Sequence, residues 1–197
     1  MTSILKVDTI QDADGNNIIN ESGNTITIGA SGDTTNIIGT LQNDGSAVGG
    51  VNTPAFRAKV TADTTFTTGT TTAVVFPSED FDTASAYNTS DGKFTVPSGQ
   101  GGKYFIYSQL LVNAGSPDQL SFAQINLYKN GAQIRNIHTN FSNNYIRRTG
   151  FNFVTVEDLS ASDYLQIYVY ADDSSGNPDL YNDSTNPNFF GAYKIIE

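Results

Sequence analysis

The distribution of aromatic residues is the feature that most constrains how this chain folds. All 12 Phe and 10 Tyr residues lie after Asn52, and residues 1–52 contain none. Aromatic side chains supply much of the apolar area that a core buries, so the first segment cannot by itself offset the entropy of becoming ordered. The sequence therefore predicts two parts, an N-terminal segment over 1–52 that orders against other chains and a globular domain over 53–197.

The N-terminal segment alternates short β-branched runs with turn clusters rich in Gly, Asn and Asp, in an imperfect repeat of roughly ten residues. This pattern favours a short β-repeat or an extended trimeric shaft in which neighbouring chains supply the missing core. The alternative is a low-complexity tail. Residues 43–50, with the sequence Asn-Asp-Gly-Ser-Ala-Val-Gly-Gly, are typical of a flexible hinge.

Charge and composition exclude several classes of function. The chain has 20 acidic and 10 basic side chains and a net charge of −10, which repels phosphate backbones, so we expect no nucleic-acid partner. With no Cys and one His, it has no disulfides, no cysteine metal site and no catalytic pair of histidines. No apolar run approaches membrane-spanning length and no export signal is evident, so we expect no membrane insertion.

The globular domain is predicted to be all-β. Its strand signals are short runs enriched in β-branched and aromatic residues and separated by turn residues. Strands are expected at Ala55 to Val60, Ala73 to Phe76, Lys93 to Val96, Lys103 to Val112, Ser121 to Tyr128, Gln133 to Thr139, Phe151 to Val156, Tyr164 to Tyr170 and Phe189 to Ile196. Asn130-Gly131 predicts a type I′ hairpin turn. This many short strands favours a jelly-roll sandwich of two antiparallel sheets.

A series of motifs in this domain occurs in a characteristic order. It consists of Phe76, Asp82, Tyr87, Phe94 and Gly102-Lys103-Tyr104, then Leu127-Tyr128-Lys129-Asn130-Gly131, then Leu159 to Leu165, and finally Phe189-Phe190-Gly191. The series resembles the globular head of the complement recognition subcomponent, within the tumour-necrosis-factor-like jelly-roll superfamily. The resemblance implies a jelly roll that assembles as a threefold homotrimer. Ser162 stands where the family has a turn glycine, and Ile106 and Ser108 stand where it has aromatics.

The start of the chain carries a second resemblance. Ser3-Ile4-Leu5-Lys6-Val7-Asp8-Thr9-Ile10-Gln11-Asp12, followed by Asp14-Gly15, is similar to the opening of fibre and decoration proteins of tailed phages of marine bacteria. This resemblance implies location on a virion, on a tail fibre or on the capsid surface. We interpret residues 1–52 as a virion-anchoring shaft and hinge that binds other virion proteins, and residues 53–197 as a head that binds the host cell surface.

Two alternatives to this interpretation remain open. One is a capsid-decorating or head-fibre trimer without specific receptor recognition, and the other is a polysaccharide-degrading spike. No Gly-x-Ser-x-Gly elbow or comparable arrangement places a nucleophile, and sequence alone cannot establish the carboxylate separation that glycoside hydrolysis needs. We therefore expect no catalytic residues and no enzymatic activity.

Two long connections, 140–150 and 172–188, carry the candidate binding residues Tyr145, Arg147, Asp173 and Tyr181. Aromatic rings cover the apolar faces of sugars, while amides, carboxylates and guanidinium groups satisfy hydroxyls. The sequence therefore predicts binding of a host-surface glycan or protein by these loops. In the alternative interpretation, the aromatic residues pin the loops onto the trimer.

Acidic residues in the second connection raise the question of a metal. Asp172, Asp173, Asp179 and Asp183 lie close in sequence and carry the oxygen ligands that calcium prefers. Some members of the family that the domain resembles bind calcium at the trimer apex. The alternative is that these are solvated loop carboxylates, since such loops are normally polar. Calcium is thus a weak candidate, and no other cofactor is expected.

Overall fold

The computed structural model describes residues 38–39, 41–43, 46–47, 52–141, 143, 145–182, 185 and 188–195. The chain divides into two units, Met1–Gly49 and Gly50–Glu197. In the first unit, β1 (Gln42–Asn43) and β2 (Ser46–Ala47) pair as a short antiparallel hairpin. Apart from residues 38, 39, 41 and 52, the rest of the predicted shaft lies outside the described residues. No helix among the described residues is long and apolar enough to cross a bilayer.

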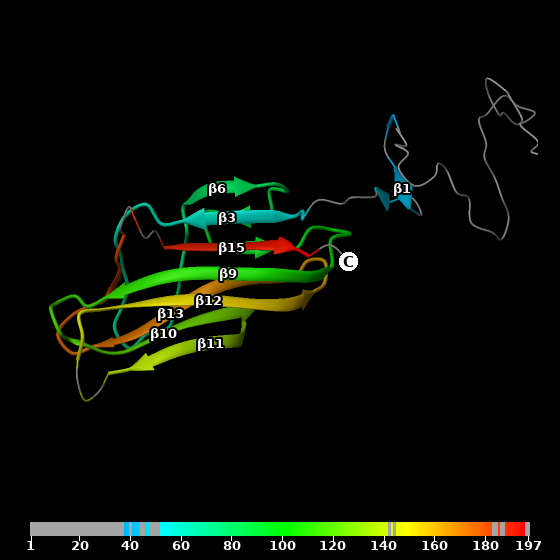
Figure 1. Cartoon of the computed structure of the whole chain (residues 1–197). Helices are drawn as coiled ribbons and strands as arrows, with labels where there is room; N and C mark the ends of the chain where they lie inside the picture. Colours follow the sequence, from blue (N-terminus) through cyan, green and yellow to red (C-terminus); the bar gives the residue numbers. More distant parts are fainter. Residues whose placement is uncertain are drawn as a thin grey trace, which may run out of the picture. The chain divides into compact units, whose positions relative to one another are not determined.

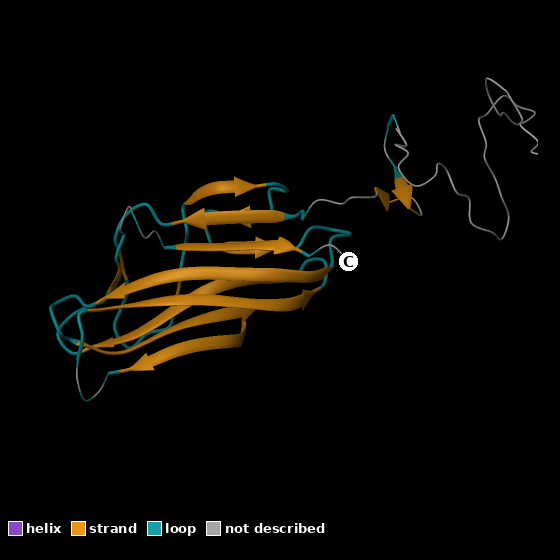
Figure 2. Ribbon diagram, in the orientation of Figure 1, coloured by secondary structure: helices purple, strands orange, loops and turns teal. Residues whose placement is uncertain are grey.

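The second unit, called the head below, is a sandwich of two antiparallel sheets (Figures 1 and 2). The first, the β9 sheet, has the order β4 (Thr64–Thr65), β14 (Asp179–Leu180), β9 (Gly102–Asn113), β15 (Phe189–Lys194), β3 (Ala55–Lys59) and β6 (Ser78–Asp82), with β12 (Arg148–Leu159) also paired to β9. The second, the β13 sheet, has the order β11 (Ala132–Asn140), β10 (Leu120–Lys129), β13 (Tyr164–Asp173), β8 (Lys93–Thr95) and β7 (Tyr87–Asn88), with β5 (Thr72–Ala73) also paired to β13. The predicted all-β jelly roll is confirmed.

The core of the head is built around Phe56. Its ring stacks on Tyr87 with ring centroids 4.8 Å apart and on Phe94 at 4.7 Å, and it meets the edge of Phe190 at 5.0 Å. All four side chains are buried. Such pairs stabilise a core beyond the area that they bury. Tyr87, Phe94 and Phe190 belong to the motifs singled out in the sequence, so the spacing of those motifs reflects one aromatic cluster shared by both sheets.

The hairpin between β10 and β11 has the predicted turn. Asn130 and Gly131 adopt φ angles of 53° and 80°, the two positive values that a type I′ turn requires. The side chain of Asn130 also donates to Oδ1 of Asp163 at 2.7 Å and accepts from the backbone N–H of Tyr164 at 2.9 Å. These bonds tie the hairpin to the neighbouring turn between β12 and β13.

That neighbouring turn keeps its shape despite the missing glycine. Ser162 adopts a φ of 71°, the left-handed conformation that normally favours Gly. Asp163 holds the turn by accepting from the backbone N–H of Ser160 and from Nζ of Lys129, both at 2.8 Å. The Lys129 ammonium, together with the amide of Asn130, lowers the pKa of the Asp163 carboxyl to about 2. The carboxylate thus stays charged at neutral pH and stabilises the strained turn.

Four strands of the head were not among those expected from the sequence: β4, β6, β7 and β14. The connection predicted as irregular over 172–188 contains β14, which pairs with both β4 and β9. The connection over 140–150 ends in β12, which begins at Arg148. Both predicted loops are therefore shorter than the sequence indicated, because strand pairing continues into them.

Candidate functional site

The structure brings the four candidate binding residues to one end of the sandwich, where β9 ends. The backbone N–H of Ala114 donates to the carbonyl of Arg147 at 2.7 Å, and that of Gly115 donates to Oδ2 of Asp173 at 2.7 Å. The backbone N–H of Tyr181 donates to the carbonyl of Leu111 at 2.9 Å. We call this region the loop end. Figure 1 shows it at the end of β9 opposite the end of β15.

The candidate residues differ in how accessible they are. Tyr145 has 43% of its surface exposed and Arg147 is also exposed, whereas Tyr181 is half-buried. The backbone on either side of Ile146 is fixed, because Ile146 and Leu120 exchange two backbone hydrogen bonds of 3.1 and 2.9 Å. Tyr145 and Arg147 are therefore accessible side chains held on an anchored segment, the arrangement that favours binding at low entropic cost.

Tyr181 is engaged by a residue that sequence reasoning did not select. The guanidinium of Arg148 lies over the Tyr181 ring, 3.6 Å from its centroid, and its Nε donates to Oδ1 of Asn113 at 3.2 Å. Asn113 in turn donates to Oδ2 of Asp179 at 3.0 Å. Burial raises the pKa of the Asp179 carboxyl, whose other oxygen is buried without a hydrogen bond. Arg148 thus holds the Tyr181 ring in place within the subunit.

The carboxylate of Asp173 binds backbone groups of the loop end and does not face solvent. It is buried, and its two carboxylate oxygens accept from the backbone N–H groups of Gly115 at 2.7 Å and Ser175 at 2.9 Å. Its role as a ligand contact stays a prediction, and Tyr145 and Arg147 are better placed for that role.

The four weak calcium candidates are not gathered around a common point. Asp172 accepts from the hydroxyl of Tyr170 at 2.7 Å, while Asp173 and Asp179 have the loop contacts given above. Asp183 lies outside the described residues. Within the described part of the chain, no three His, Cys, Asp or Glu side chains form a group that could hold a metal ion. Calcium binding therefore stays a prediction with no assembled ligand set.

A second candidate surface, which sequence reasoning missed, covers the outer side of the β9 sheet. Strand alternation turns one set of side chains out of the sandwich along β9, β12 and β15. The members of this apolar face are Phe105, Tyr107, Leu111, Val154, Val156, Phe189 and Tyr193. Val154 is 66% exposed and Val156 47%. The other members are half-buried, and an apolar surface of this kind is typical of an interaction site.

The rings of the apolar face contact one another across the strands. Phe105 stacks on Tyr193 with centroids 5.2 Å apart, and Tyr107 meets Phe189 at 5.9 Å. Arg57 lies over Phe189, 5.1 Å from its ring centroid, and pairs with Asp80 at 2.8 Å. The face is therefore a preformed, packed surface bordered by an ion pair.

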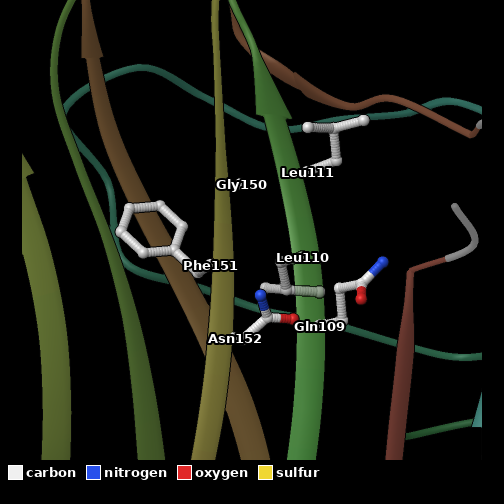
Figure 3. A pocket seen from close by; sticks show the side chains of 6 residues that line it. All are labelled: Gln109, Leu110, Leu111, Gly150, Phe151 and Asn152. Carbon is white, nitrogen blue, oxygen red and sulfur yellow. The ribbon is translucent and has the colours of Figure 1, made fainter.

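A hollow of about 250 Å³ lies beside this face, between β9 and β12 (Figure 3). Its lining residues are Gln109, Leu110, Leu111, Gly150, Phe151 and Asn152. Gly150 is paired with Leu111, and its missing side chain leaves the surface indented there. The amides of Gln109 and Asn152 edge the hollow, so it offers both apolar and hydrogen-bonding contacts to a side chain from another molecule.

One sequence signal pointed to the apolar face. In Phe151-Asn152-Phe153-Val154-Thr155-Val156, the apolar positions shift from odd to even between Phe153 and Val154, so both sides of the strand carry apolar residues. A strand exposed on one side would alternate apolar and polar residues. No comparable signal links Arg148 to Tyr181, because their contact depends on the pairing of β14 with β9.

No protein-family model and no curated protein matches this chain. Several solved structures, however, are similar to it. The globular domain of the zebrafish complement 1qA protein aligns with a TM-score of 0.53 at 13% identity, over 73% of this chain and 98% of the other. Murine APRIL aligns with TM-scores of 0.51 at 15% identity and 0.50 at 14% identity in crystals at pH 5.0 and 8.0, each over 72% of this chain and 98% of the other.

These similarities are too low in sequence identity to carry over a ligand or a partner, but they cover 98% of each solved chain. They agree with the two-sheet topology described above. The head therefore has the jelly-roll fold of the complement globular domain and of tumour-necrosis-factor-like proteins.

Proposed function

We propose that this chain is a non-enzymatic, homotrimeric fibre protein of a phage virion. Its N-terminal segment attaches to other virion proteins, and its head binds a glycan or protein on the host cell surface. The observation that carries this proposal is the division of the head into an apolar face suited to copies of the same chain and an end bearing accessible polar and aromatic side chains.

The apolar face supports the trimer. Burying a large apolar side chain contributes on the order of 1.5–3 kcal/mol, and Val154 and Val156 on this face are exposed in the single subunit. A face that contacts a neighbouring copy head-to-tail closes into a ring when the rotation between copies is threefold. The fold shared with the complement globular domain favours this number of copies.

The direction of the chain through the head supports attachment at one end and binding at the other. The chain enters β3 at Ala55, which lies beside Tyr193 and, one strand further, Phe105 near the start of β9. The loop end begins at Asn113, eight residues further along β9, or about 27 Å at the rise of an extended strand. Tyr145 and Arg147 therefore lie at the end remote from the entry point, where a fibre would meet a cell.

Labelling of virions with an antibody against the head tests this proposal. Label at the tail supports the fibre, and label spread over the capsid supports the decoration alternative. Absence of label from all virion structures contradicts both. Incubation with host polysaccharide is expected to leave chain lengths unchanged, whereas shortening of the polysaccharide chains would favour the spike alternative.

Adsorption to host cells tests the loop end directly. Replacing Tyr145 and Arg147 by Ala in the full-length chain is expected to weaken adsorption about thirtyfold or more, because aromatic and Arg anchors each contribute on the order of 2 kcal/mol to a binding patch. Avidity of three heads enlarges this loss. The measurement is binding of the fluorescently labelled protein to cells that the virion infects, with the melting temperature expected to stay near its wild-type value.

Ser160→Ala provides the matched control, since Ser160 is exposed at the opposite end of the sandwich. It should adsorb as the wild type does. If the Tyr145→Ala and Arg147→Ala pair also adsorbs normally, the loop end is not the receptor site. If the wild-type protein does not adsorb at all, the host-binding function is wrong.

A further inference from the structure

The outer side of the β13 sheet carries a regular arrangement of rings and amides that the function proposed above does not use. Across β10 and β13, three half-buried Tyr residues on this side are each paired with an amide residue. Gln124 is half-buried, whereas Asn126 and Gln166 are buried. The pairs are Tyr128 with Gln166, Tyr168 with Asn126, and Tyr170 with Gln124. We call these six residues the ring–amide ladder.

Contacts between neighbouring side chains of the ladder hold these side chains in one conformation. The rings of Tyr128 and Tyr168 lie 4.0 Å apart between centroids. The side-chain amide of Gln124 donates to the side-chain oxygen of Asn126, and that of Gln166 donates to the carbonyl of Asp91 at 2.9 Å. Rings and amides are therefore preorganised, so a ligand that contacts them loses little side-chain entropy of the protein on binding.

The neighbouring strand β11 extends the same surface. Gln133 and Asn136 pair with Tyr128 and Asn126, and His138 pairs with Gln124. All three β11 side chains are exposed. Figure 1 shows β11, β10 and β13 side by side, on the side of the sandwich away from β3 and β15. The ladder is thus on the opposite sheet from the apolar face, and trimer contacts through that face leave it accessible.

Charge distinguishes the ladder from the rest of the chain. The protein carries a net charge of −10, yet none of the six ladder residues is ionisable near neutral pH. The charged groups beside it are at its ends, where Lys93 lies over Tyr164 at 5.3 Å and Asp172 accepts from Tyr170. An uncharged ligand meets neither repulsion nor a desolvated ion there, whereas an anionic ligand gains no partner.

We propose that the ring–amide ladder is a binding site for an uncharged glycan. Tyrosine rings present flat apolar surfaces to the C–H faces of sugars, and the accessible amides of Gln124, Gln133 and Asn136 can both donate to and accept from hydroxyl groups. The ladder extends from Gln166 to Tyr170, over about 13 Å at the rise of a β-strand, enough for consecutive sugar units. The site is separate from the loop end and does not depend on Tyr145 or Arg147.

Packing alone does not account for this composition. Cross-strand contacts on an exposed sheet are also made by β-branched and aromatic residues without amides, as on the apolar face, where Phe105, Val156 and Tyr193 are neighbours. The ladder and the adjoining strand β11 instead place accessible amides, those of Gln124, Gln133 and Asn136, beside the three rings. Groups that match both the apolar and the polar surfaces of a sugar thus recur along the same strands.

Binding of the full-length chain to a panel of oligosaccharides tests the proposal. The panel contains neutral β-glucan, mannan and galactan fragments, with alginate and heparin fragments as anionic counterparts. At least one neutral fragment is expected to bind. The pair Tyr168→Ala and Tyr170→Ala should weaken that binding about thirtyfold or more through loss of two aromatic anchors, whereas Tyr168→Phe and Tyr170→Phe should retain most of it.

The loop-end pair Tyr145→Ala and Arg147→Ala is the matched control and should bind the neutral fragment normally. If the protein with Tyr168→Ala and Tyr170→Ala unfolds, a second variant with Gln133→Ala and His138→Ala tests the exposed β11 edge of the same surface. This variant is expected to bind the neutral fragment several-fold more weakly. The proposal is overturned if no neutral fragment binds or if only anionic fragments bind. It is also overturned if the folded ladder and edge variants bind the neutral fragment with unchanged affinity. If the ladder proposal fails in this way but the loop-end pair alone loses adsorption to cells, the proposed host-binding function is still supported.

Discussion

Replacing Val154 and Val156 by Asp is expected to convert the protein from a particle of three chains into single chains at micromolar concentration. Both side chains point out of the sandwich, with 66% and 47% of their surfaces exposed. In a threefold assembly each substitution places three unpaired carboxylates in an apolar contact, at a cost of several kcal/mol per buried charge. The measurement is molar mass by light scattering during size exclusion.

The fold of each subunit should survive these substitutions, because the buried neighbours Phe151 and Phe153 face the core and stay unchanged. Circular dichroism should still report β structure. Asn136→Asp with His138→Asp, at exposed positions on β11, adds charge to the other sheet and should leave the mass unchanged. A wild-type mass for the Val154 and Val156 variant would show that the apolar face is not the subunit contact.

Gly191→Ala is expected to destabilise the head more than any surface substitution. A methyl group added at Gly191 would lie 2.6 Å from the hydroxyl oxygen of Tyr107 and 2.8 Å from the carbonyl oxygen of Phe56, both inside van der Waals contact. Tyr107 can turn aside only by leaving the apolar face, and the β3 backbone cannot move without disturbing the Phe56 cluster. We expect a loss of about 3 kcal/mol or more and a melting temperature lower by roughly 10 °C.

Gly150→Ala is the matched control, since Gly150 also faces outward from the β9 sheet. Its added methyl group would meet only a methyl carbon of Leu111 at 3.7 Å, an ordinary contact. Its melting temperature should change little, because the contact is unstrained and Ala suits a strand better than Gly does. Equal thermal stability of the two variants would mean that the close approach of Tyr107 and Phe56 to Gly191 does not constrain the fold.

The long strands could be predicted from the sequence because their own residues favour them. Lys103 to Val112 and Tyr164 to Tyr170 alternate or concentrate β-forming residues, and both lie within observed strands. Strand β6 could not be predicted from the sequence, because Ser78-Glu79-Asp80-Phe81-Asp82 is acidic and has low β propensity. Strand β6 pairs with β3 because the carboxylate of Asp80 forms ion pairs with Lys59 and Arg57. The hydrogen bond from Lys59 and the charge of Arg57 hold the pKa of the Asp80 carboxyl below its usual range. Tertiary contacts outweigh local preference there.

The candidate surfaces were predicted less completely than the fold. The loop-end residues could be selected because turn composition places them outside strands, but their exposure depends on partners that are distant in sequence. Arg148 pins Tyr181, and the backbone of Gly115 engages Asp173. The ring–amide ladder is visible in the sequence as alternate positions in Tyr164-Leu165-Gln166-Ile167-Tyr168-Val169-Tyr170. Its pairing with β10 follows only from the strand register.

The two sheets have outer surfaces of different chemistry, and this difference underlies the functional account. The apolar face offers rings and valines with few hydrogen-bonding groups, which suits contact with identical chains. The ring–amide ladder offers rings and amides together, which suits sugars. An assembly through the first surface presents the second outward three times, so that weak individual binding events add through avidity.

The molar mass of the full-length protein in solution tests the central claim of a homotrimer most directly. Light scattering coupled to size exclusion at micromolar concentration should return about 63 kDa, three times the chain mass of 21.1 kDa. A mass near that of one chain would contradict the assignment of the apolar face to neighbouring copies and, with it, the trimeric fibre.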